Sequence, residues 1–210
     1  MQLVLSPRAV ATTLALAAAT CGLISVGVSP AHTAAARAAA AAAPQRTVTA
    51  SRITRPKGTL APGSKVSSAA LGQRVFTDNS HGFALADVGG AQYSAATSDG
   101  GKNWSTDGPA LHLDAAQAPL AVVNIGVASR KTVFAYGGGQ VIDTTSDGGK
   151  NWYRALFNGL VMAVVRNPQG HLVAFVDGST SSGGSKGVTW QYVSKNGGRS
   201  WRYDTTVGGS

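Results

Sequence analysis

The feature that most constrains the fold is an octet that occurs three times. Residues 97–104 and 145–152 both read TSDGGKNW, and residues 194–201 read SKNGGRSW. The octets start 48 and 49 residues apart. A period of this length is typical of repeat architectures in which each unit is one supersecondary element. We therefore expect a chain built from three copies of one unit.

Each octet stands among short segments in which apolar and polar residues alternate. These segments are rich in Val, Phe, Tyr and Thr and are bounded by Gly, Asp or Asn, as strands are. Three of them precede each octet and one follows it. The pattern predicts an all-β fold, a β-propeller-like array of about three four-stranded antiparallel blades within residues 69–210. The blades are expected at about residues 71–110, 120–158 and 159–207.

The octet itself is explained as a turn. Its Gly pair supplies positive φ at low cost, and its Thr or Ser hydroxyl and Asp carboxylate can accept backbone N–H bonds. The Trp starts the outgoing strand, where its ring can pack. In the third copy Asn replaces Asp, which keeps the acceptor and loses the charge. The predicted structural residues are Thr97, Asp99, Gly101, Trp104, Thr145, Asp147, Gly149, Trp152, Ser194, Asn196, Gly198 and Trp201.

The octets resemble a known family. Their pattern [Ser/Thr]-x-Asp-x-Gly-x-x-Trp is similar to the Asp-box or BNR repeat, which the first two copies match in full and the third matches except at Asn196. Residues 76–85 resemble a blade opening of photosystem II assembly factor-like propellers. The resemblance implies a β-propeller with each box on the hairpin between the last two strands of a blade, away from the substrate face. It does not imply an activity, because sialidases, receptors and assembly factors share the motif.

The number of blades departs from the family pattern. Closed propellers usually have four to eight blades, and the sequence holds three. Two chains could join in a homodimer that completes a six-bladed ring, or the chain could be an abbreviated relative of a longer protein. The sequence alone does not decide between a partial and an oligomer-completed propeller.

The composition argues against catalysis. The chain has no Glu, so the Tyr–Glu nucleophile pair of a sialidase cannot form. Most Asp residues outside the octets lie at expected strand ends or turns, and the Arg residues of the folded part are expected to be solvated. His81, His112 and His171 are isolated and show no zinc spacing. We predict that the protein is not an enzyme and that it has neither a cofactor nor a metal site.

The first 36 residues have the pattern of a secretory signal peptide. Arg8 precedes an uncharged stretch over residues 9–28, which contains the single Cys, and small residues follow. Cleavage is expected near Ala31 or Ala36, which predicts a secreted or cell-envelope protein. The stretch is also long enough for a retained membrane anchor, and this alternative stays open.

Residues 37–68 join an Ala run to Pro, Ser, Thr and scattered basic residues, and are predicted to be a disordered linker. Seven of the 18 basic residues and none of the nine acidic ones lie in the first 65 residues. The remaining residues are nearly balanced in charge, which argues against a nucleic-acid partner. The basic linker could contact an anionic envelope.

These observations favour a non-enzymatic interaction or assembly scaffold with an unknown protein or glycan ligand. Residues 105–120 and 179–187 are the candidate binding loops. The alternatives are a glycan-binding or sialidase-like glycoside hydrolase protein and a truncated remnant of one.

Overall fold

Three antiparallel sheets make up nearly all of the regular structure. The computed structural model describes residues 43–113, 122–178 and 187–208, all within one compact unit. The signal peptide and its cleavage sites lie outside these residues. Among the described residues, no helix is long and apolar enough to cross a bilayer.

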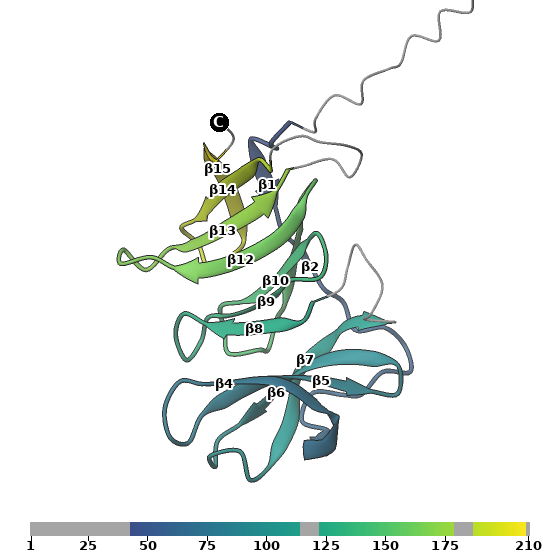
Figure 1. Cartoon of the computed structure of the whole chain (residues 1–210). Helices are drawn as coiled ribbons and strands as arrows, with labels where there is room; N and C mark the ends of the chain where they lie inside the picture. Colours follow the sequence, from purple (N-terminus) through teal and green to yellow (C-terminus); the bar gives the residue numbers. More distant parts are fainter. Residues whose placement is uncertain (1–42, 114–121, 179–186, 209–210) are drawn as a thin grey trace, which may run out of the picture. The chain divides into compact units, whose positions relative to one another are not determined.

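Each sheet contains four strands that follow one another in sequence, which we call blades 1, 2 and 3 (Figure 1). Blade 1 holds β4 (Leu71–Phe76), β5 (Gly82–Val88), β6 (Ala91–Thr97) and β7 (Trp104–Leu113). Blade 2 holds β8 (Asn124–Val127), β9 (Val133–Tyr136), β10 (Val141–Thr145) and β11 (Tyr153–Leu156). Blade 3 holds β12 (Leu160–Arg166), β13 (Leu172–Asp177), β14 (Thr189–Ser194) and β15 (Ser200–Val207). The predicted all-β class and the array of three antiparallel blades are confirmed.

The segment before blade 1 adds a fifth strand to every sheet. Strand β1 (Thr47–Thr49) pairs with β15, β2 (Ser51–Arg52) with β11, and β3 (Lys65–Val66) with β7. A short 3₁₀ helix, η1 (Ser68–Ala70), follows. The prediction of a disordered linker over residues 37–68 is therefore wrong for residues 47–66. This segment runs along the outer edges of blades 3, 2 and 1 in turn, and so covers strand edges that would otherwise be unpaired.

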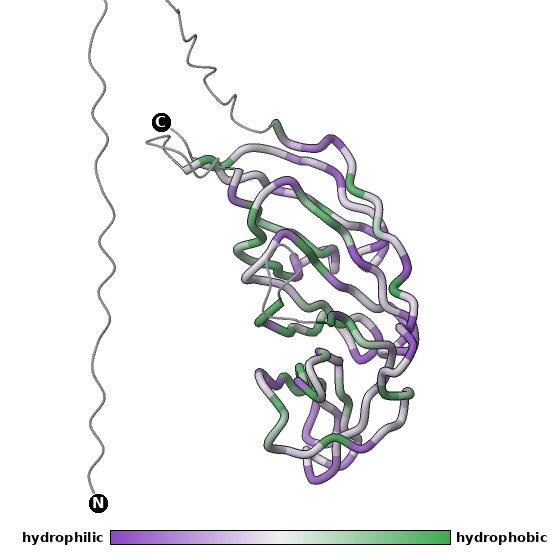
Figure 2. Tube along the Cα trace, turned by 90° about the vertical axis from the view of Figure 1, so that its right-hand side faces the viewer, coloured by the Kyte–Doolittle hydropathy of each residue, from purple (hydrophilic) through white to green (hydrophobic). Residues whose placement is uncertain are grey.

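Figure 2 shows apolar and polar residues interspersed along the chain, and some strands, such as β13, are apolar over nearly their whole length. The blades bury their apolar faces against one another in two main clusters. Phe83, Leu85 and Trp152 belong to the cluster between blades 1 and 2. Phe134, Ile142 and Trp201 belong to the one that joins blades 2 and 3. Burial of these large side chains is the main force that holds neighbouring blades together.

Among the described residues no blade precedes blade 1, and the segment over residues 47–70 packs on the face that such a blade would cover. Trp104 is 4% exposed and packs in a cluster with Val66 and three alanines of blade 1, while Ala70 and Leu71 lie partly buried against it. The segment therefore closes this face of blade 1 with its own apolar residues.

One predicted binding loop is a strand. Residues 105–113 belong to β7, which pairs with β6 through two register shifts. The other candidate loop, 179–187, lies outside the described residues except for Gly187. The prediction of a loop at 105–120 is thus wrong for residues 105–113, because the outgoing strand is longer than the octet spacing suggests.

Candidate functional site

The octets form compact hydrogen-bonded turns. In the first, the Thr97 hydroxyl donates to Asp99 Oδ1 at 2.8 Å and accepts the Gly101 N–H at 3.0 Å. Asp99 in turn accepts the backbone N–H of Asn103 at 3.0 Å and its side-chain amide at 2.7 Å. These bonds from Asn103 and Thr97 lower the pKa of Asp99 to about 2. The carboxylate is occupied by its own turn.

The other two octets repeat this arrangement. The hydroxyl of Thr145 accepts the Gly149 N–H at 3.0 Å, and that of Ser194 accepts the Gly198 N–H at 2.8 Å. Asn196 accepts the Ser200 N–H at 2.9 Å, as the Asp residues do in the other copies. The predicted residues thus lie in these turns or at the ends of the strands that flank them, and Trp152 and Trp201 are fully buried.

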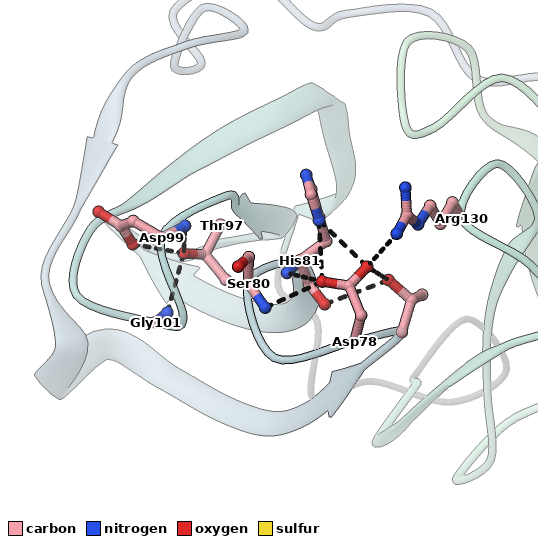
Figure 3. A network of polar contacts seen from close by, with 8 residues as sticks. Asp78, Ser80, His81, Thr97, Asp99, Gly101 and Arg130 are labelled. Atoms are coloured by element: carbon pink, nitrogen blue, oxygen red, sulfur yellow. Dashed lines mark hydrogen bonds and ion pairs between the residues drawn. The ribbon is translucent and has the colours of Figure 1, made fainter.

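Asp78 forms a polar network on the hairpin between β4 and β5 (Figure 3). It accepts the Ser80 N–H at 2.9 Å and contacts His81 Nδ1 at 2.9 Å and Arg130 of blade 2 at 2.9 Å. The hydrogen bond from His81, followed by the backbone bonds, lowers the pKa of Asp78 well below its usual range. Arg130 is 70% exposed, so the ion pair between the blades stabilises them only weakly.

A buried polar cluster lies between blades 1 and 2, and no sequence motif predicts it. Arg154 donates from Nε to Asp143 Oδ1 at 2.8 Å and from a terminal nitrogen to Asp143 Oδ2 at 2.9 Å. The same guanidinium donates to the Leu111 carbonyl at 2.5 Å and lies 3.1 Å from His112 Nε2. The side chains of Asp143 and His112 are 0% and 1% exposed. His112 is therefore not isolated, and Arg154 is not a solvated surface cation.

This cluster forms part of a surface groove. The groove has a volume of about 530 Å³ and combines three segments: β2 with the residues after it, the end of β7, and β11. It is lined by Ser51, Arg52, Ile53, Thr54, Pro56, Ala110, Leu111, His112, Leu113, Arg154 and Leu156. Strand β2 holds its place because Ser51 pairs with Arg154 and because the Ile53 N–H donates to the Trp152 carbonyl at 2.8 Å.

The groove is lined by exposed apolar side chains together with cationic ones. Leu113 and Leu156 are 55% and 51% exposed, which is unusual for leucines in strands that otherwise bury their apolar residues. Arg52 lies on the wall and its guanidinium donates to Asn151 of the second octet. Arg154 balances Asp143, so Arg52 gives the groove its excess positive charge. Such a surface suits a ligand with apolar side chains and a carboxylate.

Several of the described carboxylates are held by structural contacts. Asp143 is paired with Arg154, Asp78 with His81 and Arg130, and Asp204 accepts from Gln191 at 2.7 Å. Asp114 lies outside the described residues. Among residues 43–113, 122–178 and 187–208, no group of three His, Cys, Asp or Glu residues could hold a metal ion.

Comparison with known proteins gives one kind of match. No family model matches the chain, and no curated protein matches it. Among solved structures, one described as "YCF48 bound to D1 peptide" matches with a TM-score of 0.43 and 17% identity. The match covers 76% of this chain and 44% of the other, so the chain spans less than half of that protein's length. The resemblance to the Asp-box family therefore rests on the three octets and their turns.

Proposed function

We propose that this chain is a non-enzymatic interaction scaffold, and that the groove between blades 1 and 2 binds a polypeptide segment of a protein partner. The observation that carries the proposal is the pair of exposed leucines, Leu113 and Leu156, at the rim of a groove that contains Arg52 and Arg154. Exposed apolar side chains beside cationic groups are typical of interaction sites. The ligand we expect carries apolar side chains next to an acidic residue or a carboxyl terminus.

The lining of the groove also supports a binding role over a hydrolytic one. Hydrolysis of a glycoside by two carboxylates needs an acid and a base or nucleophile on either side of the bond. Among the residues that the structure describes, no carboxylate lines this groove, and the carboxylate of the adjoining cluster, Asp143, is buried and paired. Secretion or envelope attachment remains part of the proposal, on the strength of the N-terminal sequence pattern.

Selection of peptides tests the proposal. A random peptide library displayed on phage would be selected against the chain, and enriched peptides would be measured by fluorescence anisotropy. We expect Leu113→Asp and Leu156→Asp each to weaken binding at least about tenfold, because a charge replaces an apolar side chain that the bound peptide would bury. Leu160→Asp is the matched control, since Leu160 is 51% exposed like Leu156 but lies on blade 3. Arg52→Glu should remove the preference for acidic peptides.

Two results would overturn the proposal. The first is equal loss of binding in the Leu160 control, which would place the peptide elsewhere. The second is turnover of a fluorogenic sialoside panel that persists through purification and disappears when one Asp outside the octets is replaced. That result would favour the sialidase-like alternative.

A further inference from the structure

At both interfaces between neighbouring blades, the Gly-Gly turn of an octet packs against the adjacent blade. The turn of blade 2 lies on blade 1: a Cβ added to Gly149 would lie 2.2 Å from the carboxyl of Asp107. The turn of blade 3 lies on blade 2 in the same way, since a Cβ on Gly198 would lie 2.4 Å from the side chain of Thr144. Arg199, which follows this Gly pair, places its guanidinium 3.4 Å from the centre of the Tyr153 ring. In each case, a blade receives the octet turn of the next blade.

The outward face of blade 3 repeats the surface that receives such a turn. Thr144 stands one residue before an octet and pairs with Tyr153. Val193 stands one residue before the third octet and pairs with Arg202. Val193 therefore corresponds to Thr144, and Arg202 corresponds to Tyr153.

The correspondence extends to the neighbouring positions. Lys195 takes the place of Ser146, which in blade 2 lies 3.3 Å from a Cβ built on Gly197. In blade 1, Ala96 stands one residue before the first octet and pairs with Ser105, and Asp107 follows two residues later. In blade 3, Asp204 likewise follows Arg202 by two residues, so Asp204 corresponds to Asp107. The surface on blade 3 thus has the positions that a turn contacts at the two internal contacts.

This surface is hollow and partly apolar. Val193, Lys195, Arg202 and Asp204 line a pocket of about 450 Å³, together with Asn196, Ser200 and Tyr203. An apolar stripe runs from it across the sheet, because Val193 pairs with Val173 and Val173 with Val165. Val165 is 45% exposed. In blades 1 and 2 the face on this side is buried against the next blade.

The opposite end of the array does not offer the matching turn. In blade 1 the ring of Phe76 lies over the first octet, with Cζ 3.3 Å from a Cβ built on Gly101, and meets Trp104 edge-on. Val66 and η1 close the rest of that face. A second copy would have to displace these residues to dock its blade 1 on blade 3, which disfavours the ring of two chains that the sequence left open.

The charges on blade 3 differ from those on blade 2 in a way that selects the occupant. Arg199 lies on the aromatic ring of Tyr153, but the corresponding position on blade 3 holds the exposed cation Arg202, with Lys195 nearby. Asp204 lines the same pocket and accepts a hydrogen bond from Gln191 at 2.7 Å, so the two cations leave the surface with an excess positive charge. A basic residue after the Gly pair would be repelled there, and an acidic one would be attracted. We propose that the outward face of blade 3 binds a β-hairpin of a partner polypeptide in which a Gly-Gly turn is followed by an acidic residue.

Two cyclic peptides that carry opposite charges at position 199 test this proposal. Both carry the sequence of residues 190–203 and are cyclised through their ends to hold the hairpin; one keeps Arg199 and the other has Arg199→Glu. Nuclear magnetic resonance of the ¹⁵N-labelled chain would report binding. We expect the Glu peptide to shift the amides of Val193, Lys195 and Arg202 and to bind at least about tenfold more tightly than the Arg peptide. In the double variant Lys195→Glu/Arg202→Glu the order of affinity should reverse.

A reversed order of affinity distinguishes charge-specific recognition from non-specific binding. The proposal is wrong if peptides that are hairpins by circular dichroism leave these amides unshifted, or if the charge-swapped chain keeps the original preference. It is also wrong if light scattering shows a dimer of the chain that the substitution Val165→Lys dissociates, because a second copy would then occupy the face. These outcomes leave the groove at Leu113 and Leu156 untouched, so the two proposals fail independently.

Discussion

At the scale of single residues, the hydroxyl that begins each octet holds the turn together. Thr145 is fully buried, accepts the N–H groups of Gly149 and Asp147, and donates to the Asp147 carboxylate. In the third copy, Ser194 lacks the methyl group of threonine. Its hydroxyl still accepts the Gly198 N–H and donates to Asn196 at 3.0 Å. The turn therefore depends on the oxygen and not on the β-branched shape.

This dependence gives a pair of matched variants. Thr145→Val should destabilise the fold by about 1–3 kcal/mol, because it leaves the buried Gly149 N–H without an acceptor. Thr145→Ser should change the stability by less than about 1 kcal/mol, since serine serves in the third octet. Urea unfolding followed by tryptophan fluorescence measures both. Equal stability of the two variants would contradict the assigned role.

Asp107 is the buried carboxyl at the contact between blades 1 and 2. Its Oδ2 accepts the Ser94 hydroxyl at 3.0 Å, and Oδ1 is buried without a hydrogen-bond partner among the described residues. Burial raises the pKa of Asp107 to about 7, although Ser94 and Trp152 act to lower it. The carboxyl in the folded chain thus holds its proton to a higher pH than in the unfolded chain.

The sign of the pH dependence follows from this difference. Between about pH 4 and pH 7 the folded state binds more protons at Asp107 than the unfolded state, so its contribution to stability falls as the pH rises. The fall is at most about 4 kcal/mol and is complete above pH 7. Asp107→Asn should flatten this part of the profile and be more stable than the natural chain at pH 8, whereas Asp87→Asn on the exposed surface should not. Urea unfolding at pH 4.5 and pH 8 checks it, and an unchanged slope in Asp107→Asn would refute it.

At the scale of the elements, the short strands β1, β2 and β3 join the three blades. Each has only two or three residues, but Val48 of β1 is 4% exposed and packs in the cluster that joins blades 2 and 3. We expect Val48→Ala to destabilise the fold by about 1–3 kcal/mol and Thr47→Ala, at an exposed position of the same strand, by less than about 0.5 kcal/mol. Thermal unfolding of the two variants measures this. Equal melting temperatures would mean that β1 does not support the core.

The octets and the blade strands could be predicted because their signals are local. A Gly pair between a hydroxyl residue and a Trp specifies a turn, and alternation over five to seven residues specifies a strand. Strand β2 has two residues, and β1 contributes only Val48 to the core, so neither shows a period. The groove could not be predicted for another reason: His112 and Arg154 are 42 residues apart, and only the packing of two blades brings them together.

At the scale of the whole described unit, the two ends of the blade array differ. The N-terminal segment closes the first face of blade 1 with Val66, and the last face of blade 3 keeps Val165 exposed. The same segment forms one wall of the groove between blades 1 and 2. The fold, the groove and the difference between the ends therefore all depend on residues 47–66 being part of the sheets.

Hydrogen exchange of the backbone amides in this segment tests that dependence most directly. The N–H of Ala50 donates to the Arg199 carbonyl at 3.0 Å, that of Ile53 to Trp152 at 2.8 Å, and that of Gly63 to Thr106 at 2.6 Å, one on each blade. We predict that these three amides exchange at least about a hundredfold more slowly than in an unfolded chain, because each exchanges only when the segment detaches from its blade. Exchange of all three at the rate of an unfolded chain would show that the segment is a linker, and would remove the wall of the groove and the cap of blade 1 together.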